Sequence, residues 1–99
     1  MPANRNTPWG MSDHAEAFGP GVTLYSTPSH GGFHVSDPEL LAQIPAAHRA
    51  YAAKWSKGWG EAWFEEDCAA CAVHVAFPDR FPADDVTHAK RGLAWIERS

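Results

Sequence analysis

The chain has 99 residues, of which 44% are hydrophobic and 12% aromatic, and its formal net charge is −4. This length allows one modest core and a single small domain. The acidic balance disfavours direct nucleic-acid binding, and no apolar run approaches the roughly 20 residues that a membrane span needs. The N-terminus lacks a basic-then-apolar signal segment, so we expect a cytoplasmic protein.

The first 20 residues are interrupted by prolines and glycines and show no sustained hydrophobic period. They predict a loose N-terminal arm over residues 1–20, anchored by Trp9. A single α+β domain is expected over residues 21–99.

Residues 21–37 predict a β-hairpin. Alternation begins at Val22 in the first strand, and Phe33 and Val35 share one face of the returning strand, with His34 on the other. Turn-forming residues lie between Pro28 and Gly32. Because a lone hairpin is marginally stable in water, it must pack on other elements.

The rest of the chain predicts helices. Ser36 and Glu39 form a capping box for a short helix that Pro45 ends. Residues 46–77 give the longest helical signal, which Gly58 and Gly60 divide into two helices or bend.

A last helix is predicted after Pro82, with a buried stripe formed by Val86, Ala89, Leu93 and Ile96. The predicted fold class is therefore α+β, with one β-hairpin packed on three to four helices.

His30 and His34 are the first candidates for a functional site, because they flank a glycine pair in a loop region. If a metal binds, its ligands would be His30, His34, Glu65 and Asp67. No known ligand spacing connects these residues, so we expect neither a metal nor another cofactor. The alternative is that Gly31 and Gly32 form the turn itself, and that the imidazoles hydrogen-bond across it or to the acidic residues 65–67.

Cys68 and Cys71, followed by His74, read C-x-x-C-x-x-H, a spacing compatible with redox chemistry or structural zinc. The acidic residues just upstream would raise a thiol pKa, which disfavours a reactive cysteine. We expect both thiols to be core residues without reactivity.

Tyr51, Trp55, Trp59 and Trp63 recur every four residues and would form a winding aromatic stripe on one helix. Such a row is either a core face or a surface for a protein partner, and base stacking is a third alternative. The glycines at 58 and 60 favour exposure of Trp59, whereas Trp63 is the better core candidate. The expected partner-binding residues are His30, His34, Arg49, Trp55, Lys57 and Trp59.

Several short segments together resemble an uncharacterised domain family of alphaproteobacterial plasmids, integrative elements and phages. These segments are P-W-G at residues 8–10, H-G-G-F-H-V-S at 30–36, W-F-E-E-D-C at 63–68 and A-F-P at 76–78. The resemblance covers roughly residues 8–82 and carries no assigned activity. It implies a mobile-element context, in which small proteins often block host defence complexes, as anti-CRISPR proteins do.

The familiar catalytic motifs are absent from the sequence, which favours a non-enzymatic protein that binds and blocks a protein partner, with a host defence complex expected. The alternative is a metal-dependent hydrolase or nuclease that uses His30 and His34 with nearby carboxylates. A thiol-redox or structural-zinc module on Cys68 and Cys71 is the third reading.

Overall fold

The computed structural model describes the backbone of residues 2–98 and the side chains of residues 2–94. In chain order its elements are β1 (Asn6–Thr7), β2 (Gly10–Met11), β3 (His14–Ala17), β4 (Val22–Ser26), β5 (Gly31–Val35), α1 (Pro38–Gln43), α2 (Ala46–Trp55), β6 (Trp63–Glu65), α3 (Ala70–Ala76), a 3₁₀ turn (Pro78–Arg80) and α4 (Ala83–Arg98). The predicted α+β class is confirmed. No helix in the described part of the chain is long and apolar enough to cross a membrane.

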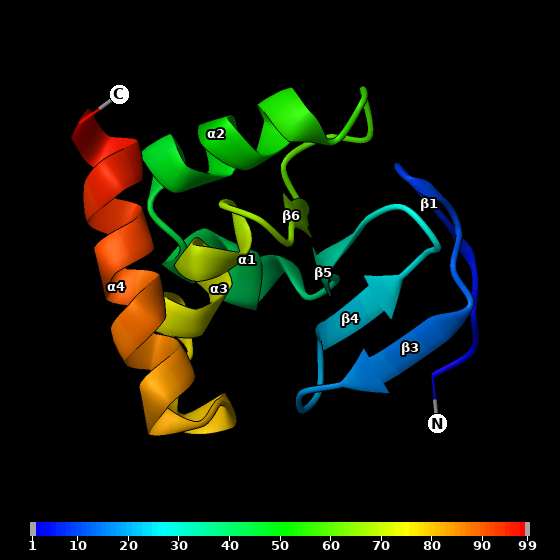
Figure 1. Ribbon diagram of the computed structural model, residues 1–99, viewed down its shortest axis with the longest axis horizontal. Helices are drawn as coiled ribbons and strands as arrows, with labels where there is room; N and C mark the ends of the chain where they lie inside the picture. Colours follow the sequence, from blue (N-terminus) through cyan, green and yellow to red (C-terminus); the bar gives the residue numbers. More distant parts are fainter. Residues whose placement is uncertain (1, 99) are drawn as a thin grey trace.

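The centre of the fold is an antiparallel four-stranded sheet in the order β3-β4-β5-β6. The predicted hairpin is confirmed as its central pair, with Leu24 opposite Phe33 and Tyr25 opposite Gly32. The helices lie on one side of this sheet, with α3 between the sheet and α4, and the small β1–β2 hairpin lies on the other side (Figure 1).

The two faces of the sheet bury different side chains. The helix-covered face holds the main core, which includes Val22, Phe33, Val35 and Phe64 together with residues of α3. The opposite face holds a smaller aromatic cluster made by Trp9, Ala15, Tyr25 and Trp63. Strand alternation explains this division, because successive side chains point to opposite faces.

The N-terminal segment differs from the predicted loose arm. Residues 6–11 form the β1–β2 hairpin, and β3 pairs with β4 along its whole length, from His14 opposite Ser26 to Ala17 opposite Thr23. Trp9 does anchor the segment: it is buried, and its indole N–H donates to the carbonyl oxygen of Trp55 at 3.2 Å. Residues 6–17 are therefore part of the same folded unit as the sheet.

The long helical signal at residues 46–77 is interrupted more strongly than expected. Helix α2 ends at Trp55, and the chain then turns through Lys57, Gly58 and Gly60, all with positive φ. Residues 63–65 form an edge strand, in which Phe64 lies opposite Phe33. The tryptophans at 55, 59 and 63 therefore do not share a helix, because pairing with β5 overrides the local four-residue period.

Two further details correct the sequence reading. The cap of α1 is Asp37, whose carboxylate accepts the backbone N–H of Glu39 at 2.9 Å, and not Ser36. The chain turns between β4 and β5 at residues 27–30, where Thr27 Oγ1 donates to the carbonyl of His30, so Gly31 and Gly32 belong to β5 instead of the turn. Helix α4 is confirmed, but the side chain of Ile96 lies outside the described residues.

The stability of the fold is expected to fall in mild acid because of a half-buried histidine. The ring of His74 in α3 packs edge-on against Phe33 and Phe81, at centroid distances of 5.4 and 4.3 Å. Burial lowers the pKa of His74 below its ordinary value of 6.5, and the nearby charge of Asp85 opposes this shift only in part. The unfolded chain then binds more protons between the two pKa values, so stability is complete above about 6.5 and is lost as pH falls through the folded pKa.

Urea unfolding between pH 7 and pH 5 measures this effect. His74→Phe should flatten the decline in unfolding free energy, whereas His14→Gln, at an exposed position in β3, should leave it unchanged. The pKa of His34 is also lowered, first by burial and then by the charge of Arg5, so a smaller pH dependence should remain. An unaltered slope in His74→Phe would contradict the prediction.

Candidate functional site

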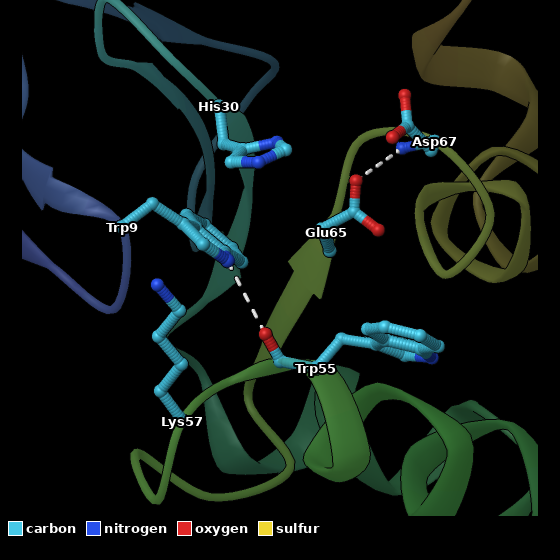
Figure 2. A pocket seen from close by; sticks show the side chains of 6 residues that line it. All are labelled: Trp9, His30, Trp55, Lys57, Glu65 and Asp67. Carbon is cyan, nitrogen blue, oxygen red and sulfur yellow. Dashed lines mark hydrogen bonds between the residues drawn. The ribbon is translucent and has the colours of Figure 1, made fainter.

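An open pocket forms where four segments meet: the β1–β2 turn, the β4–β5 turn, the end of α2 with the turn after it, and the end of β6 (Figure 2). Its volume is about 270 Å³. The lining residues are Trp9, His30, Trp55, Lys57, Glu65 and Asp67. The pocket therefore unites residues expected for partner binding with residues expected as metal ligands.

Strand pairing explains why Glu65 reaches this pocket. Glu65 lies opposite Gly32, on the sheet face that carries the aromatic cluster. Gly32 has no side chain, and the ring of Trp9 occupies the space above it. Glu65 and Trp9 thus become neighbouring walls of one pocket, although 56 positions separate them in the sequence (65 − 9 = 56).

The carboxyl group of Glu65 is the most enclosed polar group of the pocket. The residue is only 9% exposed, and its Oε1 accepts the backbone N–H of Asp67 at 2.8 Å. Burial is the main reason that the pKa of Glu65 is raised, and the negative charge of Asp67 adds to it. The Asp67 N–H and the charge of His30 act in the opposite direction.

His30, Glu65 and Asp67 bring three potential ligand atoms within 4.8 Å of one another. His30 and Asp67 are exposed residues outside the strands, whereas Glu65 is a buried residue of strand β6. Three of the four predicted metal ligands therefore meet in space.

His34, the fourth predicted ligand, does not belong to this group. Its ring stacks on Trp63 at a centroid distance of 4.1 Å and an interplanar angle of 8°. The strand register explains the separation, because His34 lies opposite Trp63 while His30 precedes β5 altogether. His34 thus supports the aromatic cluster and does not line the pocket.

Trp55 is the last residue of α2, and Lys57 and Trp59 lie in the turn after it. Trp55 is 52% and Trp59 42% exposed, which fits the sequence expectation for Trp59. Lys57 has a φ of 53°, an uncommon backbone conformation for a residue with a side chain. Ser56 stabilises the turn, because its buried hydroxyl donates a hydrogen bond to the carbonyl oxygen of Gly60 at 2.7 Å.

Arg49 was also expected at the partner surface, but its guanidinium already has partners in the fold. It forms an ion pair with Glu61 at 3.0 Å and donates to the carbonyl of Ile44 at 3.0 Å. Arg49 does not line the pocket. Its contact with Glu61 connects α2 to the turn that follows this helix.

Cys68 and Cys71 are free thiols of intermediate burial, so they are less enclosed than the predicted core position. Burial raises the pKa of Cys71, and the neighbouring Cys68 adds to the shift. Cys71 and His74 line a second open pocket of about 460 Å³, beside Asp67, Asp85 and His88. A raised thiol pKa opposes nucleophilic or redox chemistry at Cys71.

Comparison with known proteins gives one match. A family described as a domain of unknown function (DUF7007) matches residues 2–97, nearly the whole described chain. The chain belongs to this family. Its uncharacterised status agrees with the resemblance seen in the sequence, and the match extends beyond residues 8–82 at both ends. No curated protein and no solved structure matches the chain.

Trp9 is the pocket residue that sequence reasoning placed elsewhere, as an anchor of the arm. The signal that could have found it is the P-W-G turn at residues 8–10, which presents an aromatic side chain at the tip of a tight hairpin. Trp9 packs over Gly32, which lies in a different segment of the chain. The sequence around Gly32 does not indicate this contact.

Proposed function

We propose that the protein acts by binding a protein partner through a surface made by His30, Trp55, Lys57 and Trp59, which we call the tryptophan surface. The observation that carries this proposal is the exposure of two large aromatic side chains four residues apart, Trp55 and Trp59, of which Trp55 lines the open pocket. In the described part of the chain, the exposed large hydrophobic residues are Met11, Trp55 and Trp59.

The tryptophan surface has the composition of a protein-binding site. Tryptophan is enriched among residues that dominate binding energy, and such residues work best when neighbouring groups exclude water around them. Trp59 rests edge-on against buried Trp63 at 5.5 Å, and Trp55 contacts Tyr51 at 6.4 Å. Because both rings are supported by the fold, less side-chain freedom is lost on binding than for unsupported exposed residues.

The charges favour a protein over nucleic acid. Lys57 is the cation of the pocket, but the same pocket contains Glu65 and Asp67, and the formal net charge of the chain is −4. A phosphate backbone would be repelled by these carboxylates. A protein partner with a mixed-charge surface and a small apolar recess fits better.

The biological setting belongs to the same proposal. A small protein from a mobile element would meet host defence complexes, and blocking such a complex requires only a specific surface. We therefore propose an alphaproteobacterial defence complex as the partner, with the anti-CRISPR type of inhibition as the leading case.

Removing both exposed tryptophans should abolish partner binding without unfolding the protein. We expect the double variant Trp55→Ala, Trp59→Ala to weaken binding by about 30-fold or more, equivalent to about 2 kcal/mol. The measurement is capture from a nuclease-treated alphaproteobacterial lysate, followed by titration of the purified partner against both proteins. The melting temperature should remain nearly unchanged because neither side chain is buried.

Met11→Ala is the matched control, since it removes a 58% exposed apolar side chain from β2. It should bind like the original protein. Equal binding by the double variant, or equal loss in the Met11 variant, would refute the tryptophan surface.

A further inference from the structure

We propose that His30, Glu65 and Asp67 bind one divalent transition-metal cation, with zinc as the best-fitting case, at the mouth of the pocket beside Trp9. This site shares His30 with the tryptophan surface, but its ligands do not include either exposed tryptophan, so the two proposals can be tested separately. No known ligand spacing connects the three residues in the sequence, and the pairing of β5 with β6 brings them together.

The distances between the ligand atoms allow the three side chains to close around a cation. The three ligand atoms lie within 4.8 Å of one another, whereas ligands of a tetrahedral zinc ion are about 3.4 Å apart for bonds of about 2.1 Å. A closure of up to about 1.4 Å is therefore needed. His30 and Asp67 can supply it, because both are exposed, while Glu65 stays in place on its strand.

The surroundings of Glu65 are a separate argument for a cation. Glu65 is a buried residue, 9% exposed, and its carboxylate accepts a hydrogen bond from the backbone N–H of Asp67. Its other close polar neighbours are the Asp67 carboxyl and His30. A cation between these two carboxyl groups would offset the repulsion between their negative charges. The N–H of Asp67 fixes one oxygen of Glu65, as a group that orients a ligand does (Figure 2).

The donor set selects the class of cation. One imidazole nitrogen with two carboxylates is a combination that zinc and related transition metals accept. Calcium and magnesium prefer oxygen ligands in larger numbers, which this cluster does not offer. The two carboxylates also neutralise the charge of a divalent ion, so its burial beside Trp9 is electrostatically balanced.

Three protein ligands would leave a fourth tetrahedral position for water or an anion. Lys57 lines the same pocket, and its ammonium group favours an anionic fourth ligand. An open site of this kind is the first requirement of a metal-dependent hydrolase, the alternative function considered from the sequence.

Calorimetric titration of the metal-free protein with zinc chloride tests the site. We expect one equivalent to bind, and both His30→Gln and Asp67→Asn to weaken binding by more than about tenfold. Both substitutions are at exposed positions, so the fold should persist. Glu65→Gln provides a third, nearly isosteric test that keeps an acceptor for the Asp67 N–H.

Two controls match the ligands in chemistry and position. Glu66→Gln removes the adjacent carboxylate, which is near Gly31, and His34→Gln removes the imidazole that stacks on Trp63. Both variants should keep the affinity of the original protein for zinc. The variant lacking Trp55 and Trp59 should keep it as well, which separates this proposal from the partner-binding proposal.

Cobalt(II) distinguishes this site from a cysteine site. The complex should lack the near-ultraviolet charge-transfer band that a thiolate ligand produces, since the proposed ligands are nitrogen and oxygen only. The proposal is overturned by absence of zinc binding, by retained binding in both His30→Gln and Asp67→Asn, or by equal loss in the controls. A thiolate band that disappears in Cys68→Ser or Cys71→Ser would also overturn it, in favour of the C-x-x-C pair.

Discussion

Trp63→Ala is expected to lower the free energy of unfolding by about 3–5 kcal/mol, as other large deletions in protein cores do. Trp63 is 3% exposed and lies at the centre of the aromatic cluster. Its ring contacts Trp9 edge-on at 6.1 Å, lies 5.8 Å from Tyr25 and stacks on His34. No single neighbour can fill the space left by the indole, because each is fixed by a different element.

The loss should extend beyond the cavity itself. The guanidinium of Arg5 lies 5.1 Å from the Trp63 ring, so the substitution also removes a cation–π contact with the N-terminal segment. Trp59 would lose the surface on which it rests. The N-terminal strands should therefore exchange amide hydrogens faster in the variant than the strands of the helix-covered face.

Urea unfolding of Trp63→Ala and Trp55→Ala makes the comparison sharp, because the same side chain is deleted at a buried and at an exposed position. Trp55→Ala should cost little, since its ring is 52% exposed. Similar losses in the two variants would mean that the cluster does not behave as a core. In that case the support that we assign to Trp59 would also be lost.

Elements with strong local signals could be predicted from the sequence. The β4–β5 hairpin follows from alternation between Val22 and Val35, and α4 follows from its periodic stripe after Pro82. In both cases the residues that decide the structure are close together in the chain. Local periodicity therefore agrees with the final packing.

Elements that depend on pairing with distant residues could not be predicted from the sequence. The sequence 63–65 has a helical neighbour on one side and glycines on the other, and its strand conformation comes from β5, nearly 30 residues earlier (63 − 34 = 29). The N-terminal strands are similar, because β3 is short and has one buried residue, Ala15. Short edge strands have little local signal, so tertiary contacts decide them.

The candidate site shows the same division. The sequence singled out His30, Lys57, Glu65 and Asp67 by residue type, and all four line one pocket. It could not show that His34 would stack on Trp63, nor that Trp9 would pack over Gly32 and form a wall of the pocket. Those placements depend on strand register, which a single sequence does not reveal.

Gly32→Ala should destabilise the protein by about 2–4 kcal/mol, although it adds only a methyl group. A Cβ at this position would collide with the carbonyl oxygen of Phe64 and would lie 2.5 Å from Cη2 of Trp9. Neither neighbour can move freely. The carbonyl belongs to β6, which pairs with β5, and the Trp9 ring is held by its hydrogen bond to the Trp55 carbonyl.

Gly58→Ala is the control for this substitution, because it separates lack of space from backbone strain. Gly58 has a φ of +88°, but an added Cβ there would meet nothing within 4 Å. Its cost should be about 1–2 kcal/mol, from conformation alone. Gly32→Ala should in addition displace Trp9, and with it one wall of the pocket, so zinc affinity should fall even under conditions where the variant is fully folded. A Gly32 variant that is as stable as the original protein would show that Trp9 does not pack closely on β5, and would remove the structural basis of the pocket.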